Sequence, residues 1–487
     1  MKPATLGELK QRGQPTGFRS VKDELRANLI QKLSGGEELF PGIVGYQDSV
    51  VPAIVNALLA RHNLILLGLR GQAKSRILRA LTEFLDPEVP CVAGCEINDD
   101  PFFPICGDCQ RRVSEEGDDL PIAYLSRQQR YVEKLATPDV TIADIIGDLD
   151  PIKAAKHGRE LSAHENIHFG LLPRAHRGIF AMNELPDLAP KIQVGLFNIM
   201  QEGDVQIKGF PIRLPLDLLM VFSANPEDYT ARGKIITPLK DRIGSEVKTH
   251  YPDRIEEGLQ ITLQEAWIQR GESNSTTVPA FIAEVVEGIA FDGRRSQLVD
   301  KRSGVSQRMP ISCLESTVSN AERRALTAQE KEVVPRISDI YASIPTITGK
   351  LELEYEGELK GAENVTRDLI RSSLLRTFKH HFRDQRFDQI VQWFDLGGVV
   401  KVHDQTPSAE YFRKVKAIQG LEETLKSLGV SPKKDLPTAI SWVEFILEGL
   451  FAQKLLSRNE ERGYFKEVAP EEEDMPGDSS LPQRSFN

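Results

Sequence analysis

A glycine-rich turn between an apolar run and a helical pattern constrains this sequence more than any other feature. The run Asn63–Gly68 is typical of a buried parallel strand, and residues 74–85 follow it with helical spacing. The turn between them, Gly68-Leu-Arg-Gly-Gln-Ala-Lys-Ser75, is of the kind whose backbone N–H groups point at a phosphate. Because strands and helices alternate further along the chain, we expect an α/β domain around a parallel sheet.

The side chains that close this turn favour nucleotide binding. Lys74 would reach the β and γ phosphates, and the Ser75 hydroxyl would bind Mg²⁺. The usual pattern has glycine before the lysine, whereas this chain has Ala73; because alanine permits helical backbone angles, we expect a mild departure. The alternative is a coincidental glycine-rich turn with a surface lysine. The predicted nucleotide-binding residues of the turn are Gly68, Gly71, Ala73, Lys74 and Ser75.

Two further apolar runs end in polar residues that suit phosphate chemistry. Gly178–Asn183 leads into Glu184, which fits the base that orients an attacking water. Asn183 stands where an aspartate would help to hold Mg²⁺, so we expect slow hydrolysis or an unusual metal shell; a strand end without catalytic duty is the alternative. The run from Leu219 ends at Asn225, whose amide can position water, although Asn-Pro is also a common turn.

Four of the five cysteines lie in residues 91–109, as the pairs Cys91-x3-Cys95 and Cys106-x2-Cys109. Zn²⁺ takes tetrahedral thiolate ligands from two such turns, so the spacing predicts a structural zinc site at all four cysteines. An iron–sulfur cluster and free or redox-active thiols are the alternatives. The segment interrupts the α/β pattern and is therefore predicted to be an insertion that can serve as a platform for a partner.

Composition limits the partners and the compartment. The 487 residues include 61 Lys and Arg and 71 Asp and Glu, giving a net charge of −10, which argues against a surface built to hold nucleic acid. No apolar run approaches the roughly 18 residues of a membrane helix, and residues 1–20 lack an apolar signal core. We therefore expect a cytoplasmic protein without a membrane partner.

The remaining patterns divide the chain into five parts. The predicted parts are an N-terminal segment (1–38), an α/β core (39–252) with the cysteine insertion (91–109), a helical region (253–345), a C-terminal helical extension (346–465) and a disordered tail (466–487). Within the core, a helix is predicted over Ala189–Glu202 and a β-hairpin after it, turning near Gly209.

In these motifs the chain resembles the AAA+ ATPases, in the branch that holds magnesium-chelatase subunit I and the MoxR ATPases. The resemblance covers roughly residues 40–252 and continues more weakly to about residue 325. The segments that carry it, besides the phosphate loop, are Thr141–Asp150, Gly170–Gly178, the hairpin at Val205–Leu214, Leu239-Lys-Asp-Arg-Ile-Gly and Gly304-Val-Ser-Gln-Arg308. The resemblance implies a P-loop AAA+ core followed by a helical lid at 253–345.

The resemblance also implies roles for single residues. Arg242 would be an arginine finger that reaches the γ-phosphate of a neighbouring subunit, and Arg308 would be the sensor-2 residue of the lid. Asn225 would be sensor 1, and Ile43 and Val44 would line the adenine pocket. The alternatives are a surface ion pair for Arg242 and a plain helix start for Arg308. Because a finger acts between subunits, the family implies a homo-oligomeric ring, expected to be a hexamer.

The function implied is an ATP-hydrolysing remodelling motor that uses ATP and Mg²⁺ and acts on a protein client in metal or cofactor insertion or in complex assembly. The MoxR resemblance suggests a partner with a von Willebrand factor A domain; the chain has no Asp-x-Ser-x-Ser motif, so that domain would belong to another protein. The helical extension exceeds the compact chelatase subunit, which favours remodelling over chelatase activity itself. The alternatives are an enhancer-binding transcription activator, although its Gly-Ala-Phe-Thr-Gly-Ala loop is missing, and a nucleotide-binding scaffold with weak hydrolysis because of Asn183.

Overall fold

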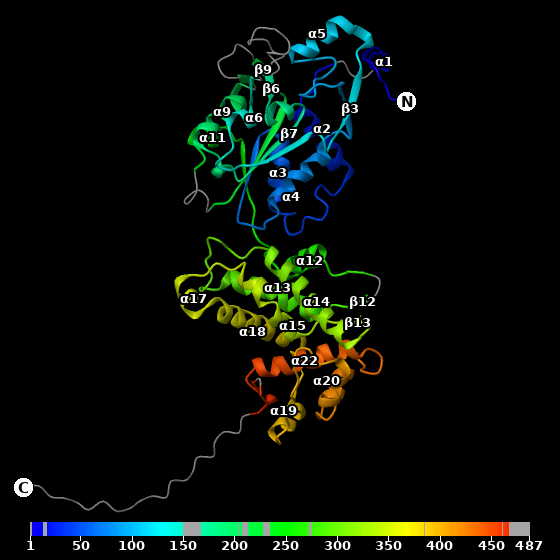
Figure 1. Cartoon of the computed structure of the whole chain (residues 1–487), viewed down its shortest axis with the longest axis vertical. Helices are drawn as coiled ribbons and strands as arrows, with labels where there is room; N and C mark the ends of the chain where they lie inside the picture. The colour runs from blue at the N-terminus through cyan, green and yellow to red at the C-terminus, as the bar shows by residue number, and fades with distance from the viewer. Residues whose placement is uncertain are drawn as a thin grey trace, which may run out of the picture. The chain divides into compact units, whose positions relative to one another are not determined.

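The computed structural model describes residues 2–12, 17–149, 167–202, 204–206, 213–226, 234–271, 275–383, 385–459 and 461–466. It divides into two compact units, each continuous in space but not in sequence (Figure 1). The first unit holds Met1–Ile261 and Val299–Arg308, and the second holds Thr262–Leu298 and Met309–Asn487. Residues 467–487 of the predicted tail and the hairpin tip near Gly209 lie outside the described residues.

A five-stranded parallel sheet forms the centre of the first unit. Its strands, in spatial order, are β11 (Ser245–Lys248), β1 (Leu64–Leu67), β10 (Leu218–Ala224), β7 (Gly178–Asn183) and β4 (Tyr131–Leu135). All four neighbouring pairs run parallel. The three strands predicted from apolar runs are β1, β7 and β10, the interior strands, so the expected α/β fold with a parallel sheet is confirmed.

The two edge strands, β4 and β11, carry no comparable sequence signal. Their sequences are Tyr-Val-Glu-Lys-Leu and Ser-Glu-Val-Lys, and each is only partly buried. An edge strand pairs on one side only and tolerates charged residues, so it lacks the continuous apolar run by which the interior strands are recognised.

Helices cover both faces of this sheet (Figure 1). On one face lie α2 (Val21–Gly35), α3 (Val50–Leu59) and α4 (Lys74–Ala80), which continues as the 3-10 helix η1 (Leu81–Phe84). On the other face lie α6 (Ile142–Ile145), α8 (Leu171–Arg174), α9 (Pro190–Glu202) and α11 (Thr237–Arg242). Successive strand residues alternate between the faces, so in β7 Ile179 and Ala181 pack toward α4 whereas Phe180 and Met182 pack toward α9.

The cysteine segment is part of a small subdomain. Its antiparallel pair β2 (Glu88–Val92) and β3 (Ile122–Ser126) frames α5 (Gly107–Glu116), and the N-terminal α1 (Leu6–Gln11) packs beside them. Leu6 shares an apolar cluster with Val92, Cys106 and Cys109, and its N–H donates to Leu120 O at 3.0 Å. The start of the chain therefore covers the cysteine insertion.

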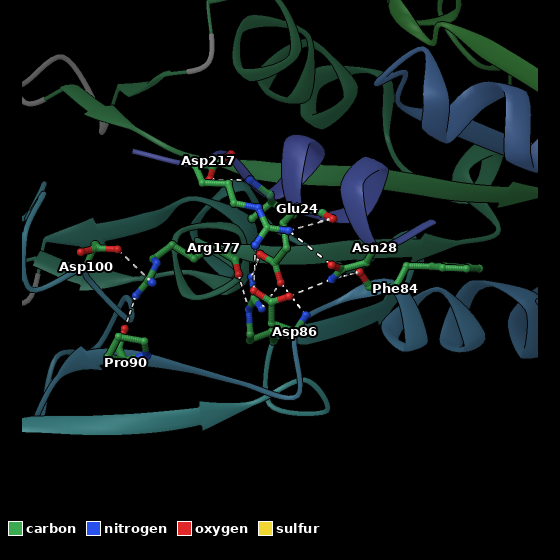
Figure 2. Close-up of polar contacts among 11 residues, drawn as sticks. Glu24, Asn28, Phe84, Asp86, Pro90, Asp100, Arg177 and Asp217 are labelled. Carbon is green, nitrogen blue, oxygen red and sulfur yellow. Dashed lines mark hydrogen bonds and ion pairs between the residues drawn. The ribbon is translucent and has the colours of Figure 1, made fainter. Parts of the chain in front are cut away.

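A buried polar network fastens α2 to the sheet and to the cysteine segment (Figure 2). Glu24 of α2 accepts two hydrogen bonds of 2.7 Å from the Arg130 guanidinium, and both side chains are at least 94% buried, with exposures of 6% and 2%. Arg177, just before β7, forms an ion pair with Asp100 at 3.0 Å and donates to Pro90 O at 2.6 Å. The carboxylate of Asp217 accepts from the first N–H of α2, that of Val21, at 2.8 Å.

The first unit also contains two short antiparallel pairs. One is β5 (Gly147–Leu149) with β6 (Ile167–Phe169), and the other is β8 (Asp204–Gln206) with β9 (Arg213–Pro215), which are the strands of the predicted hairpin. The remaining elements of the first unit are the 3-10 helices η2 (Gly117–Asp119) and η4 (Leu185–Asp187) and the start of α12 (Ile255–Glu265). The end of α12 belongs to the second unit.

The second unit is almost entirely helical. Its helices are α13 (Ala280–Arg295), α14 (Arg308–Ala328), α15 (Ile337–Ala342), α16 (Ile344–Thr348), α17 (Tyr355–Lys360), α18 (Ala362–His381), α19 (Asp388–Asp395), α20 (Ser408–Val415), α21 (Leu421–Ser427) and α22 (Leu436–Ala452). Two short pairs accompany them, β12 (Ser275–Thr276) with β13 (Glu332–Val333) and β14 (Ser457–Asn459) with β15 (Gly463–Phe465).

The core of this unit joins the two parts that the sequence suggested as lid and extension. Phe281 of α13 stacks on Phe445 of α22 with ring centroids 4.3 Å apart, and Arg324 of α14 pairs with the buried Asp339 at 2.6 Å. The segment 351–354, in which leucine and glutamate alternate, leads into the helix α17. Among the described helices, none combines the length and apolar character needed to cross a membrane.

Candidate nucleotide and metal sites

The carboxyl edge of the sheet gathers the side chains predicted for phosphate chemistry. The phosphate loop follows β1, Asn183 and Glu184 end β7, and Asn225 follows β10. Because β1, β10 and β7 are consecutive parallel strands, all of these residues emerge at one edge. Hydrogen bonds among these side chains connect them into one site.

Lys74 lies at the centre of this group and is buried. Its ammonium donates to Asn225 Oδ1 at 2.5 Å, to Leu69 O at 3.0 Å and to Gly68 O. The lysine of the loop and the predicted sensor 1 amide are therefore in direct contact.

Glu184 is held at the end of β7 in the left-handed backbone region, with φ of 54°. Its carboxylate oxygen Oε2 accepts from Asn225 Nδ2 at 2.9 Å, and its N–H donates to Ser223 Oγ at 3.3 Å. A non-glycine residue in this region costs on the order of 1–3 kcal/mol and persists where the surroundings over-determine it, often at functional sites. The geometry suits a carboxylate that is restrained until a nucleotide displaces the amide.

Asn183 faces the loop serine rather than solvent. Its Oδ1 accepts from Ser223 Oγ at 2.9 Å and lies 3.5 Å from Ser75 Oγ, while its Nδ2 donates to Glu133 Oε1 at 2.5 Å. Mg²⁺ takes oxygen ligands in a shell that keeps several waters. The Ser75 hydroxyl and the Asn183 amide oxygen fit that donor set, and Glu133 brings a carboxylate next to it.

The backbone at Ala73 differs from the expectation of a mild departure. Ala73 has φ of 56° and ψ of 14°, which is the left-handed region and not a helical conformation. This region is readily accessible to glycine and strained for alanine because of the Cβ atom. The missing glycine is therefore a source of local strain at the start of α4.

The segment around Arg308 packs directly on the loop within the first unit. A Cβ added to Gly71 would lie 2.0 Å from Ser306 Oγ, so only glycine fits beneath this segment. Arg308, the predicted sensor-2 residue, is the first residue of α14, and its N–H donates to Ser306 Oγ at 3.2 Å. The structure thus brings Ser306 and its neighbours to the phosphate loop.

A pocket of about 280 Å³ lies beside the residues predicted to bind adenine. Its lining includes Ile43, Val44, Arg254, Glu257 and Gln260, among nine residues in all. The neighbouring Tyr46 hydroxyl donates to Gln72 O at 3.1 Å and to His250 O at 2.7 Å, which ties this segment to the phosphate loop.

Arg242 lies apart from this cluster of contacts, at the end of α11. Its guanidinium is 4.0 Å from the ring centroid of Phe197 in α9, and its Nη1 donates to Pro238 O at 3.0 Å. The side chain is 29% exposed. This placement leaves the arginine accessible at the surface of the first unit.

The cysteine segment forms a second candidate site. The ligand atoms of Cys95, Asp99, Cys106 and Cys109 all lie within 4.8 Å of one another. Tetrahedral Zn–S bonds of about 2.3 Å separate sulfur ligands by about 3.8 Å, so the group needs only a small contraction to hold zinc. The N–H groups of Asp99 and Cys109 donate to Cys95 Sγ and Cys106 Sγ, both at 3.4 Å.

Asp99 occupies the place that the spacing assigned to Cys91. Its side chain is fully buried; Oδ2 accepts from Cys106 N at 2.9 Å, and Oδ1 has no hydrogen-bond partner within the part of the chain that is described. Burial raises the pKa of Asp99 to about 6. Cys91 lies outside the group because it is fixed in β2 opposite Ala123, where strand pairing sets its direction.

Contacts among the three clustered thiols shift their proton affinities in opposite directions. Hydrogen bonds from Cys106 and Cys109 lower the pKa of Cys95 to about 2, whereas contact with the neighbouring thiols and burial raises the pKa of Cys109. The lowered pKa of Cys95 favours its thiolate, which is the form of cysteine that binds metal.

Two residues of these sites, Glu133 and Asp99, were not predicted from the sequence. Glu133 lies in an edge strand without an apolar run, and Asp99 is one of two adjacent aspartates in a loop. The available signal for Asp99 was its position between the cysteine pairs, since carboxylates are also zinc ligands.

The chain is similar in sequence to magnesium-chelatase subunits. It is 28% identical over 314 residues to the subunit ChlI of Nostoc sp., covering 62% of this chain and 80% of that protein. It is 25% identical over 374 residues to ChlI of Guillardia theta, covering 72% of this chain and 91% of that protein. No family model matches the chain.

A solved complex of the magnesium-chelatase subunits BchI and BchD aligns with 66% of this chain and 98% of the matched chain, at 20% identity and a TM-score of 0.36. The fold assignment does not depend on it, because the strand order and the phosphate loop are visible in the chain itself. The phosphate loop and the five-stranded parallel sheet give the chain the fold of a P-loop AAA+ core, and its sequence is similar to magnesium-chelatase subunit I.

Proposed function

We propose that this protein is an ATP-hydrolysing AAA+ motor that remodels a protein partner. The observation that carries the proposal is the hydrogen-bonded group of Lys74, Asn225 and Glu184 at the carboxyl edge of the sheet. In this proposal Lys74 binds the β and γ phosphates, Ser75 binds Mg²⁺, Glu184 orients water and Asn225 senses the γ-phosphate. Ile43 and Val44, which line the pocket beside the loop, contact the adenine.

In this proposal, nucleotide binding rearranges the contacts among these three side chains. A γ-phosphate attracts the Lys74 ammonium, which then leaves Asn225 Oδ1. The amide of Asn225 is thereby able to turn toward the phosphate and release Glu184 Oε2, which accepts a proton from the attacking water. Bound Mg²⁺ would neutralise charge on the phosphates, and the Ser75 hydroxyl would hold it.

The partner and the assembly are inferred from the similarity to ChlI and to a subunit that forms a complex in magnesium chelatase. The proposed assembly is a homo-oligomeric ring, with six subunits as the family suggests, in which Arg242 acts on the neighbouring subunit's nucleotide. The proposed client is a protein that inserts a metal or cofactor or that carries a von Willebrand factor A domain.

Measurements of ATP binding and hydrolysis by the purified chain test this function. Lys74→Ala should abolish ATP binding, and Glu184→Gln should retain binding while lowering turnover by at least about 100-fold, since a general base contributes roughly that much. Lys350→Ala, an exposed lysine of the second unit, is the matched control. Equal ATP binding by Lys74→Ala and the wild type would refute the nucleotide site.

The cysteine segment is proposed to hold a structural Zn²⁺ with Cys95, Cys106, Cys109 and Asp99 as ligands. The support is the mutual distance of the four ligand atoms and the unpaired, buried Asp99 Oδ1. Because four protein ligands leave no open position, the ion would stabilise the insertion and not take part in hydrolysis.

Elemental analysis of protein purified without chelators tests the zinc site. We expect about one zinc per chain by the ligand count. Cys109→Ser and Asp99→Ala should lose it, whereas Cys91→Ser should retain it and is the matched control. Iron with acid-labile sulfide would indicate a cluster instead, and protein without zinc or iron would contradict the proposal.

A further inference from the structure

Asn183 leaves the candidate magnesium site without the negative charge that an aspartate at this strand end would supply. The amide oxygen of Asn183 is 3.5 Å from Ser75 Oγ, the hydroxyl placed to bind the metal. A neutral amide is a weak partner for Mg²⁺, which proteins usually hold with one or two carboxylates together with the substrate phosphates. The structure contains a carboxylate that meets this need, on the neighbouring strand.

Glu133 of β4 is that carboxylate. In the parallel pairing of β4 and β7, Glu133 is opposite Ala181 and Leu135 is opposite Asn183, so Glu133 lies on the α4 face of the sheet, one step before Asn183. A glutamate side chain spans that step, and Oε1 accepts from Asn183 Nδ2 at 2.5 Å. The strand register therefore places the Glu133 carboxylate next to Asn183, the end of β7, which has no charged side chain of its own.

Arg79 holds this carboxylate in place from the helix that bears Ser75. Its Nε donates to Glu133 Oε2 at 2.8 Å and its Nη2 to Oε1 at 3.2 Å, a bidentate contact that fixes the plane of the carboxylate. Arg79 follows Ser75 by four residues in α4, so the two side chains lie on one helix face. Ser75, Asn183, Glu133 and Arg79 thus form one continuous row of contacts.

The other nearby carboxylate is already engaged elsewhere. Glu184 Oε2 accepts from Asn225, on the β10 side of β7, whereas Glu133 lies on the β4 side. One acid is thus placed toward the lysine and the water, and the other toward the serine hydroxyl. An Asp-Glu pair usually ends this strand, one residue holding the metal and the other orienting water. In this chain those two roles would fall to Glu133 of β4 and Glu184 after β7.

We propose that Glu133 is the charge-bearing positioning residue of the magnesium site, taking over the part of the missing aspartate. This inference rests on the proposed function. Glu133 orients the Asn183 amide toward Ser75 and supplies negative charge close enough to accept hydrogen bonds from water on the ion. Mg²⁺ keeps most of its water when bound, so a carboxylate beyond direct ligation distance still holds it.

The test measures how strongly Mg²⁺ tightens ATP binding, as the ratio of the dissociation constants in EDTA and in excess Mg²⁺. Glu133→Gln should lower this ratio about 10- to 100-fold, the effect of removing an outer partner of a metal site, and should leave binding in EDTA unchanged. Glu83→Gln is the matched control. Glu83 also pairs with an arginine, Arg127, at 2.5 Å, but it is not among the hydrogen-bond partners of Asn183 in the described part of the chain. This variant should therefore keep the wild-type ratio.

The decisive variant moves the carboxylate from β4 to β7. In the double substitution Asn183→Asp with Glu133→Gln, the amide and the acid exchange places while the charge stays constant. Because the two side chains are in contact, their effects are coupled, and the Mg²⁺ effect should return to within about threefold of the wild type. If the role of Glu133 were merely structural, Asn183→Asp would not restore the Mg²⁺ effect that Glu133→Gln removes.

The outcomes separate this inference from the function on which it rests. If the wild type binds no ATP in either buffer, the proposed function fails, and the inference with it. If ATP binds and Glu133→Gln retains the wild-type ratio, only the inference is overturned. A folded double variant that stays as weak as Glu133→Gln also overturns it.

Discussion

At the scale of single residues, the backbone at Ala73 is the clearest departure from the usual phosphate loop. Its φ of 56° belongs to the region that glycine occupies without strain. The side chain is exposed, so the cost comes from the backbone and not from packing. The chain therefore carries strain at the residue that joins the loop to α4.

Ala73→Gly should stabilise the protein. Removing Cβ relieves about 1–2 kcal/mol of left-handed strain, while the added freedom of glycine in the unfolded chain offsets about 0.5–1 kcal/mol. We expect a net gain of about 0.5–1 kcal/mol, visible as a higher denaturant midpoint of the first unit. Ala27→Gly, at an exposed position inside α2, should lower the midpoint by a similar amount. The same direction for both substitutions would contradict this account.

At the level of secondary-structure elements, the buried pair of Glu24 and Arg130 anchors α2 to the turn just before β4. Breaking a buried pair leaves one charge without its partner, so Glu24→Ala should cost about 3–5 kcal/mol. The surface pair of Glu37 and Lys32 is the control, because Glu37→Ala should cost less than about 1 kcal/mol. Chemical denaturation of the full chain measures both, and similar small losses would show that α2 is held mainly by its apolar face.

The first turn of α2 should also respond to pH through Asp217. Burial raises the pKa of this carboxyl group to about 6, above its ordinary 3.8. Between these values the folded state holds more protons than the unfolded state, so the contribution of Asp217 to stability falls as pH rises, by up to about 1.4 kcal/mol per unit.

Asp217→Asn keeps an acceptor for Val21 N–H and removes this titration. The stability of the variant relative to the wild type should increase from pH 4 to pH 6 and then level off. Melting temperatures of both proteins across this range provide the measurement. A difference that does not change with pH would mean that Asp217 titrates alike in the folded and unfolded states.

At the scale of the whole molecule, the proposed ring makes activity depend on two neighbouring subunits. Lys74→Ala and Arg242→Ala should each be inactive alone, because one lacks its own phosphate contact and the other lacks the arginine offered to its neighbour. Mixing the two should restore part of the ATPase activity, because some interfaces then pair an intact loop with an intact arginine. A mixture as inactive as its components would place both residues in the same site.

The division into two units does not follow the limits of the predicted helical region. Residues 253–345 read as one helical region, yet the chain crosses between units near residues 261, 298 and 308. Helical periodicity indicates that a segment is buried on one face but not which partner covers it. The division of the chain into core, lid and extension therefore stays a proposal.

The interior strands and the polar residues that follow them are recognisable from the sequence alone. An interior parallel strand is buried on both faces, so β1, β7 and β10 appear as continuous apolar runs, and the polar residues after them must meet at one edge. These runs predict Lys74, Ser75, Glu184 and Asn225 as site residues, and the tertiary structure connects Lys74, Asn225 and Glu184 by hydrogen bonds.

The residues that complete these sites depend on tertiary contacts and cannot be recognised from the sequence. Glu133 reaches Asn183 because two strands pair in a particular register, and Asp99 joins three cysteines because strand β2 fixes Cys91 outside their group. Contacts of this kind depend on the pairing of segments that are far apart or on the direction of one side chain, and neither is encoded in spacing along the chain. The left-handed backbone of Ala73 belongs with them, since the loop imposes it on a residue whose own preference is different.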